Sequence, residues 1–146
     1  MLTGMDHIAF AVSNLEQSLR FYRDLLGLPV IVHRVWREEY VRQMVGIPDA
    51  SLNIALLQLP GQGGLILELI EYEQPRGAPI PTQVYTPGNA HMALRVNDIE
   101  GLYTRLVAAG IQFLSPPMAV TAGPNQGRKA VYLRDPDGII VQMMDP

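Results

Sequence analysis

The stretch His7-Ile8-Ala9-Phe10-Ala11-Val12-Ser13-Asn14-Leu15-Glu16 occurs a second time, in similar form, in this chain of 146 residues. The second copy is His91-Met92-Ala93-Leu94-Arg95-Val96-Asn97-Asp98-Ile99-Glu100, which begins at position 91 instead of 7, an offset of 84. The segment Ile66–Glu71 likewise resembles Ile140–Asp145, at an offset of 74. Such an internal repeat predicts two modules of one design, with shorter loops in the second.

Each copy opens with the alternating pattern of a half-buried strand. In the first copy, His7 shares a face with Ala9 and Ala11, whereas the opposite face consists of bulky apolar residues that should pack on helices. In the second copy, His91 shares a face with Ala93. Small neighbours leave space beside each imidazole, so both histidines are candidates for a functional site.

A helix is predicted after each of these strands. Ser13-Asn14-Leu15-Glu16 and Asn97-Asp98-Ile99-Glu100 are candidate capping boxes, the second with Asn97 at the N-cap. Gly27 and Gly110 are the expected stops. The apolar stripe of the first helix comprises Leu15, Leu19, Tyr22 and Leu26.

The rest of each module is predicted to be strands and loops. The expected strands span 30–37, 53–59, 65–72, 112–114, 129–134 and 139–144. Asp135-Pro136-Asp137-Gly138 is typical of a hairpin turn, and a turn is also expected at Gly61–Gly64. A long loop covers 115–127. We expect one domain over 1–146, made of modules 1–73 and 90–146 joined by a proline-rich linker at 74–89.

Composition excludes several classes of protein. Hydrophobic residues make up 48% of the chain and charged residues 17%, which favours a buried core over disorder. The net charge of −3 argues against a nucleic-acid partner. No cysteine is present, so disulfides and thiolate metal sites are excluded. No signal peptide or apolar run of membrane-spanning length is evident, and a cytoplasmic protein with no membrane partner is expected.

The repeat, together with four sequence motifs, resembles the vicinal oxygen chelate superfamily, specifically its glyoxalase-like members. The motifs are Asp6-His7-Ile8-Ala9, Leu26-Gly27-Leu28, His91-Met92-Ala93 and Asp135–Gln142. The superfamily includes glyoxalases, bleomycin-resistance proteins and dioxygenases. The resemblance implies an α+β fold in which two repeated βαβββ modules form an open eight-stranded cup.

The resemblance also implies a set of metal ligands, one from the first and one from the last strand of each module. Transferred to this chain, they are His7, Glu68, His91 and Gln142. Two imidazoles, a carboxylate and an amide oxygen suit a divalent ion, with Zn, Ni, Co, Mn, Fe and Mg all open. The alternatives are a core role for the histidines, a solvated strand face for Glu68 and a merely tolerated polar side chain for Gln142.

The departures from known members narrow the implied activity. Glyoxalases carry a glutamate base where this chain has Gln142, and an amide is not a useful base, so Glu68 is the candidate catalytic residue. Methylmalonyl-CoA epimerases have an additional glutamate on the third strand, where our alignment places Ala55. Extradiol dioxygenases need a carboxylate at position 142. Both of these activities are therefore disfavoured, although they remain alternatives.

The expected function is that of a glyoxalase-like, divalent-metal-dependent lyase or isomerase. Its substrate would be a small molecule that chelates the metal through vicinal oxygens, and proton transfer would pass through an enediolate. The alternative is a non-catalytic binder that sequesters a ligand, like bleomycin-resistance proteins. A homodimer is expected because a single cup leaves sheet edges and an apolar face exposed. Whether the cup is built within one chain or across two is left open.

Other candidate residues are weaker. A basic pair after the long loop could hold an anionic group, although a solvated turn explains it better. Three tyrosines are candidates for lining the cup, and Tyr72 or Glu71 could replace Glu68 as the base. The third histidine has no counterpart in the repeat and is assigned to the surface or a pocket wall. These remaining candidates are Arg128, Lys129, Tyr72, Tyr85, Tyr132 and His33.

Overall fold

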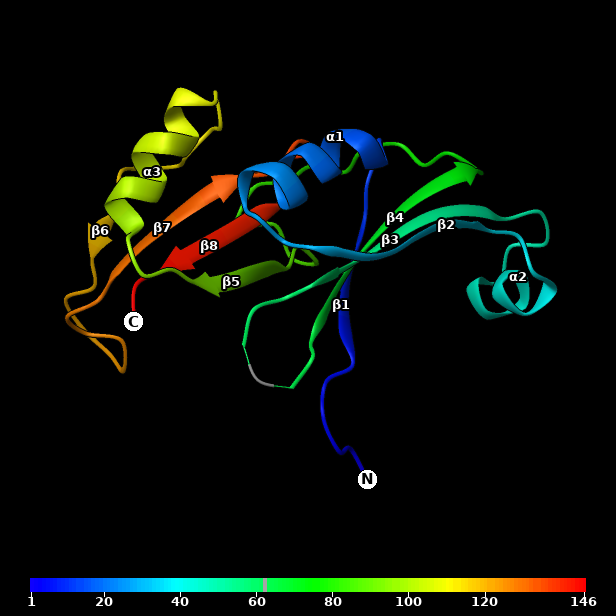
Figure 1. Cartoon of the computed structure of the whole chain (residues 1–146), viewed down its shortest axis with the longest axis horizontal. Coiled ribbons are helices and arrows are strands. Elements are labelled where there is room, and N and C mark those ends of the chain that lie inside the picture. Colours follow the sequence, from blue (N-terminus) through cyan, green and yellow to red (C-terminus); the bar gives the residue numbers. More distant parts are fainter. Residues whose placement is uncertain (62) are drawn as a thin grey trace. The chain divides into compact units, whose positions relative to one another are not determined.

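The computed structural model describes residues 1–61 and 63–146, and it divides into two compact units, Met1–Pro79 and Ile80–Pro146 (Figure 1). The boundary falls inside the predicted linker 74–89. Each unit therefore contains one copy of the sequence repeat.

The first unit is a four-stranded mixed sheet with short helices. Its elements are β1 (His7–Ala11), α1 (Leu15–Leu19), the π-helical η1 (Arg20–Leu25), β2 (Val30–Trp36), α2 (Glu39–Val45), β3 (Ser51–Gln58) and β4 (Ile66–Gln74). The strand order is β1-β4-β3-β2. β1 runs parallel to β4, and the other pairs are antiparallel.

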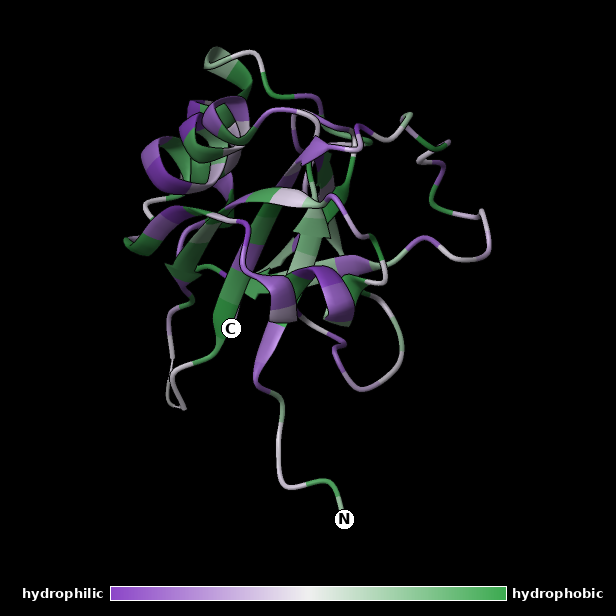
Figure 2. Cartoon of the chain, turned by 90° about the vertical axis from the view of Figure 1, so that its right-hand side faces the viewer, coloured by the Kyte–Doolittle hydropathy of each residue, from purple (hydrophilic) through white to green (hydrophobic). Residues whose placement is uncertain are grey.

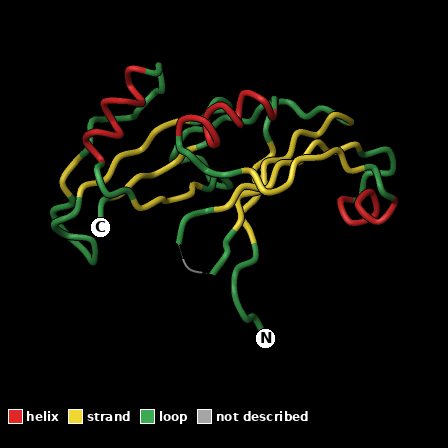
Figure 3. The backbone as a smooth tube through the Cα atoms, viewed as in Figure 1, coloured by secondary structure: helices red, strands yellow, loops and turns green. Residues whose placement is uncertain are grey.

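The second unit repeats this topology with fewer residues (Figure 3). Its elements are β5 (His91–Arg95), α3 (Ile99–Ala108), β6 (Met118–Ala119), β7 (Lys129–Arg134) and β8 (Ile140–Met144). The strand order is β5-β8-β7-β6, again with the first strand parallel to the last. The predicted α+β fold of two repeated modules is confirmed.

The strand registers of the two units match residue by residue. In the first unit, His7 pairs with Ile66 and Ala9 with Glu68. In the second unit, His91 pairs with Ile140, which corresponds to Ile66 in the repeat, and Ala93 pairs with Gln142. The sequence offsets of 84 for the first strands and 74 for the last strands therefore correspond to the same strand pairing in both units.

The helical segments that follow β1 and β5 each cover one face of their sheet. Phe10 on β1 is buried, and its ring lies 6.5 Å from that of Tyr22, which is fully buried on η1. In the second unit, Leu106 of α3 and Leu133 of β7 are fully buried. Figure 2 shows both hydrophilic and hydrophobic residues along the helical ribbons, as expected when only one side of a helix packs on a sheet. His7 and His91 each lie on the opposite face of their own sheet, as predicted. We call this face of each sheet its histidine face.

Helix α2 was not predicted, and it lies on the histidine face of the first sheet. Val41 of α2 forms a buried cluster with Ala50, Leu52 and Ile54. The helix ends at Gly46, which adopts a left-handed conformation with φ of 72°. Seven residues give only about two turns, too few for a clear periodic signal, so the helix depends on tertiary packing.

The prediction for the sixth strand was wrong in position. Residues 112–114 form only an isolated bridge between Phe113 and Leu133, and β6 lies within the predicted loop 115–127. Pro116 and Pro117 have no N–H to donate, which interrupts the ladder until Met118–Ala119 pairs with β7.

The caps and turns largely follow the sequence. Asn14 caps α1, but the cap of α3 is Asp98 rather than the predicted Asn97, because the Asp98 carboxylate accepts from the Gly101 N–H at 2.8 Å. The turn Asp135–Gly138 is confirmed, with the Asp135 carboxylate accepting from two backbone N–H groups. The predicted turn Gly61–Gly64 includes Gln62, which lies outside the described residues. No helix in the described part of the chain is long and apolar enough to cross a membrane.

Candidate metal centre

The structure brings His7 and Glu68 together on one face of the first sheet. Their strands are parallel neighbours, and Glu68 pairs with Ala9, two residues after His7. The Nε2 atom of His7 lies 3.2 Å from Oε2 of Glu68. The Glu68 side chain is 18% exposed and that of His7 is 45% exposed, so the pair remains accessible. The predicted solvated alternative for Glu68 does not describe this partly buried position.

Asp6 orients the imidazole of His7 from the other side. The Asp6 carboxylate lies 2.8 Å from Nδ1 of His7 and accepts a hydrogen bond from this nitrogen, which leaves Nε2 directed toward Glu68. This hydrogen bond to Asp6 raises the pKa of His7, and the negative charges of Glu68 and Asp6 add to the effect, against an opposing contribution from burial. A carboxylate that holds the far nitrogen of a histidine in this way is the usual support for a metal ligand. Sequence reasoning did not assign Asp6 this role, although an acidic residue directly before His7 was the available signal.

The second unit places His91 and Gln142 in the equivalent positions. Gln142 pairs with Ala93 on one side and with Tyr132 on the other. The Tyr132 ring meets the His91 ring edge-on, with the ring centroids 5.4 Å apart and the planes at 88°. His91, Tyr132 and Gln142 therefore share one face of this sheet. The corresponding residue opposite Glu68 in the first unit is Leu56.

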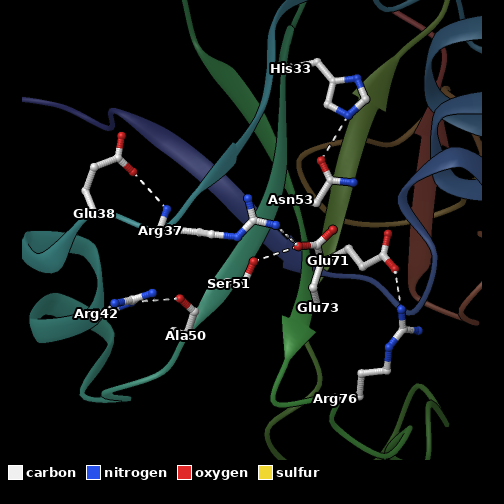
Figure 4. Close-up of polar contacts among 10 residues, drawn as sticks. All are labelled: His33, Arg37, Glu38, Arg42, Ala50, Ser51, Asn53, Glu71, Glu73 and Arg76. Carbon is white, nitrogen blue, oxygen red and sulfur yellow. Dashed lines mark hydrogen bonds and ion pairs between the residues drawn. The ribbon is translucent and has the colours of Figure 1, made fainter.

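Two alternative bases near Glu68 are engaged elsewhere. Glu71 lies on the opposite face of β4, where its carboxylate accepts from the Leu15 N–H at 3.0 Å and pairs with Arg76 (Figure 4). Tyr72 packs against the apolar cluster that α2 covers. Ala55 is buried and pairs with Leu69, so it faces away from Glu68. None of these residues places a second carboxylate beside Glu68.

The remaining polar candidates have local partners. His33 is exposed and its Nε2 lies 3.1 Å from the side-chain oxygen of Asn53 (Figure 4), in line with the surface assignment. Lys129 begins strand β7 and pairs with Glu100 on α3 at 2.7 Å. Arg128 lies 3.8 Å from the sulfur of Met144.

A complete ligand set is not assembled from acidic and histidine side chains alone. In residues 1–61 and 63–146, no three side chains of His, Cys, Asp or Glu are grouped so as to hold a metal ion. Each sheet instead presents two donors at equivalent positions, His7 with Glu68 and His91 with Gln142. The four-residue ligand set therefore stays a prediction.

Known proteins resemble this chain in both sequence and fold. The 2-epi-5-epi-valiolone epimerase of an Actinomyces species is 27% identical over 97% of this chain and 79% of its own length. Metallothiol transferase FosB of Staphylococcus epidermidis is 27% identical over 94% of the chain and 80% of its own length. The mitochondrial methylmalonyl-CoA epimerase of Mus musculus is 25% identical over 97% and 72%, respectively.

The fold has a counterpart among solved structures. A glyoxalase family protein from Bacillus cereus superposes with a TM-score of 0.85 at 20% identity, covering 99% of this chain and 95% of the other. The model of the Glyoxalase/Bleomycin resistance protein/Dioxygenase superfamily matches residues 4–143. The chain therefore belongs to the glyoxalase/bleomycin resistance protein/dioxygenase superfamily, as its repeat predicted.

Proposed function

We propose that this protein is a divalent-metal-dependent isomerase that acts on a small substrate with two neighbouring oxygen atoms. The ligands of the ion would be His7, Glu68, His91 and Gln142. The observation that carries the proposal is the 3.2 Å separation between His7 Nε2 and Glu68 Oε2, with Asp6 holding the other nitrogen of the ring.

The donor atoms of the first unit suit a divalent ion. Metal–nitrogen and metal–oxygen bonds of roughly 2.0–2.2 Å place neighbouring donors about 3 Å apart, which is close to the observed separation. In the second unit, the imidazole of His91 and the amide of Gln142 add two neutral donors at equivalent register positions. A set with only one carboxylate leaves a divalent ion with a surplus positive charge. The bound ion would polarise the two substrate oxygens and so acidify the neighbouring C–H group.

Glu68 would transfer the proton. It is the one carboxylate in the proposed ligand set, and Glu71, three residues later, is occupied at the start of α1. The Glu68 carboxylate would take the proton from the carbon beside the substrate carbonyl and return it to the neighbouring carbon on the same side of the enediolate. Two of the relatives named above are epimerases, and this supports an isomerase over a lyase.

Metal analysis of the purified protein is the first test. We expect one divalent ion per chain after reconstitution and dialysis, and loss of this stoichiometry in the double variant His7→Ala/His91→Ala. Failure to bind Zn, Co, Ni or Mn at micromolar concentrations would overturn the proposal and favour the ligand-sequestering alternative.

Proton exchange is the second test. The metal-loaded protein is incubated in D₂O with a panel of 2-hydroxyketones, 2-keto acids and 2-acyl thioesters, and deuterium incorporation is followed by NMR. We expect metal-dependent exchange at the carbon next to the carbonyl in at least one of these classes. Exchange that persists equally in the Glu68→Gln variant would exclude Glu68 as the base.

A further inference from the structure

A small groove lies on the second unit beside the outer strand β6. Its volume is about 240 Å³, and its walls come from β6, the segments on either side of it, and β7. This volume is smaller than the several hundred Å³ typical of sites that enclose a whole drug-sized ligand, so the groove suits one part of a small molecule. The lining residues are Ser115, Met118, Ala119, Val120, Ala130, Val131 and Tyr132.

The groove is continuous with the histidine face through Tyr132. Ala130 and Tyr132 are two residues apart on β7, so their side chains share one face, and Tyr132 pairs with Gln142 on β8. Beyond Gln142, the Tyr132 ring makes a T-shaped contact with the ring of His91 on β5. The Tyr132 side chain therefore both lines the groove and touches one of the proposed metal ligands.

The walls of the groove are mainly apolar. Met118, a residue that is 59% exposed, pairs with Ala130 across the two strands. The hydroxyl of Ser115 donates to the carbonyl of Pro116 at 2.9 Å and is thus already engaged. No charged side chain lines this groove, so it suits an aliphatic or aromatic group and offers nothing to a phosphate or carboxylate.

The first unit has a leucine at the position that Tyr132 holds in the second. The residue equivalent to Tyr132, opposite Glu68, is Leu56, which packs against the cluster covered by α2. α2 lies between β2 and β3 and occupies part of the histidine face in the first unit. Residues 120–128, which connect β6 to β7 at the equivalent place in the second unit, form no helix. Because of this difference between the units, the exposed apolar groove lies on the histidine face of the second unit, which carries His91.

We propose that this groove binds the apolar substituent of the substrate, and that Tyr132 forms the boundary between that substituent and the metal-bound oxygens. This inference rests on the proposed function and adds a substrate class to it. The substrate carries a short aliphatic or aromatic group next to its two chelating oxygens. Ala130 and Met118 set the size of that group.

Hydroxamates provide a test that needs no knowledge of the substrate, because they chelate divalent ions through two neighbouring oxygens. Acetohydroxamate, hexanohydroxamate and benzohydroxamate are titrated into the Co-loaded protein by calorimetry. We expect hexanohydroxamate and benzohydroxamate to bind at least about tenfold more tightly than acetohydroxamate, because apolar surface is buried in the groove.

Three variants separate the groove from the metal. Ala130→Leu fills the groove and should remove most of the gain for the two larger probes while leaving acetohydroxamate binding within about twofold. Met118→Ala removes an apolar wall and should reduce the same gain without adding bulk. Ala108→Leu makes the same change as the first variant on the exposed surface of α3 and should have no effect. The metal content of each variant is measured in parallel.

The outcomes distinguish the two proposals. If acetohydroxamate does not bind the metal-loaded protein, the proposed chelating function is overturned, and this inference with it. If acetohydroxamate binds but the larger probes gain nothing, or their gain survives both Ala130→Leu and Met118→Ala, the groove is not the substituent site and the proposed function stands.

Discussion

The Nε2 atom of His7 lies 3.2 Å from the Oε2 atom of Glu68, although the strands that carry them are the first and last of their module. The parallel pairing of β1 with β4 creates this contact, because it aligns Ala9 with Glu68 and so places His7 and Glu68 on one face. The same pairing of β5 with β8 places His91 and Gln142 equivalently. The chemical difference between the modules is thus a carboxylate in one and an amide in the other.

Replacing the carboxylate of Glu68 tests its role as a base. Glu68→Gln should lower the rate of proton exchange by roughly 10²–10⁴-fold, because an amide does not accept a proton near neutral pH. Metal binding should weaken but remain measurable, because the amide oxygen can still coordinate. The matched control is Glu71→Gln, whose amide oxygen can still accept from the Leu15 N–H and which should keep full exchange. Full turnover in Glu68→Gln would mean that another group is the base.

Gln142→Glu adds a carboxylate to the second module, whereas Glu68→Gln removes one from the first. A second carboxylate should tighten divalent-ion binding, measured by competition with a chromogenic chelator, because it neutralises the remaining positive charge of the site. We also expect it to create or improve isomerisation of the hemithioacetal formed from methylglyoxal and glutathione, since it restores the missing base. A variant that binds the ion less tightly than the parent would argue that Gln142 is not a ligand.

The hydrogen bond between Asp6 and His7 predicts two linked effects. In the metal-free protein, Asp6→Asn should lower the pKa of His7, measured by NMR titration, because the carboxylate that stabilises the imidazolium is removed. Removing the carboxylate should also weaken metal binding by roughly 10–100-fold, because the imidazole ring is no longer held with Nε2 directed toward Glu68. Asp24→Asn, which affects a pair with Arg23 on the surface, should change neither quantity. An unchanged His7 pKa would show that Asp6 does not hold the ring in solution.

The raised pKa of His7 also determines how the stability of the metal-free protein and its affinity for a metal ion change with pH. Because the pKa is raised by folding, the stabilisation from His7 in the metal-free protein is fully present below the unfolded value of about 6.5 and is lost as the pH rises through the higher folded value. Metal binding has the opposite dependence, since the ion competes with the proton for Nε2. Asp6→Asn should therefore shift the pH at which His7 loses its proton downward.

Gly138 and Gly64 occupy equivalent places in the two modules and permit a matched stability test. Both have positive φ, 82° and 66° respectively, but a Cβ on Gly138 would lie 2.7 Å from the Thr82 hydroxyl, whereas one on Gly64 meets nothing within 4 Å. Gly138→Ala should lower the free energy of unfolding by about 1–3 kcal/mol and Gly64→Ala by about 1 kcal/mol, measured by urea denaturation. Equal losses would show that the Thr82 contact is relieved at no cost.

A homodimer is expected from the outer strands of the two sheets. β2 and β6 are edge strands of their sheets. β2 exposes Ile31 and Val32, and β6 exposes Met118, so both edges carry exposed apolar residues. Sedimentation velocity at micromolar concentration should give the mass of two chains. A single species with the mass of one chain would contradict the prediction.

The sequence by itself determined the repeat, the succession of strand, helix and further strands in each module, and the equivalence of His7 with His91 and of Glu68 with Gln142, because alternation and offset are local patterns that repeat along the chain. The predicted helix stops at Gly27 and Gly110 agree with the structure. The observed N-caps, Asn14 and Asp98, each lie one residue after the first residue of the predicted capping box, and α2 was not predicted. These features depend on backbone hydrogen bonding and on the burial of one face, both of which are written into neighbouring residues.

Only the tertiary structure decided the surroundings of those four residues. Helix α2 depends on the packing of Val41 against Leu52 and Ile54, and the contact of Tyr132 with His91 crosses an intervening strand. The pairing of His7 with Glu68 and the diversion of Glu71 to the start of α1 likewise join positions far apart in the chain. Such contacts leave no periodic trace in the sequence, because they are fixed by strand pairing and side-chain packing rather than by neighbouring residues.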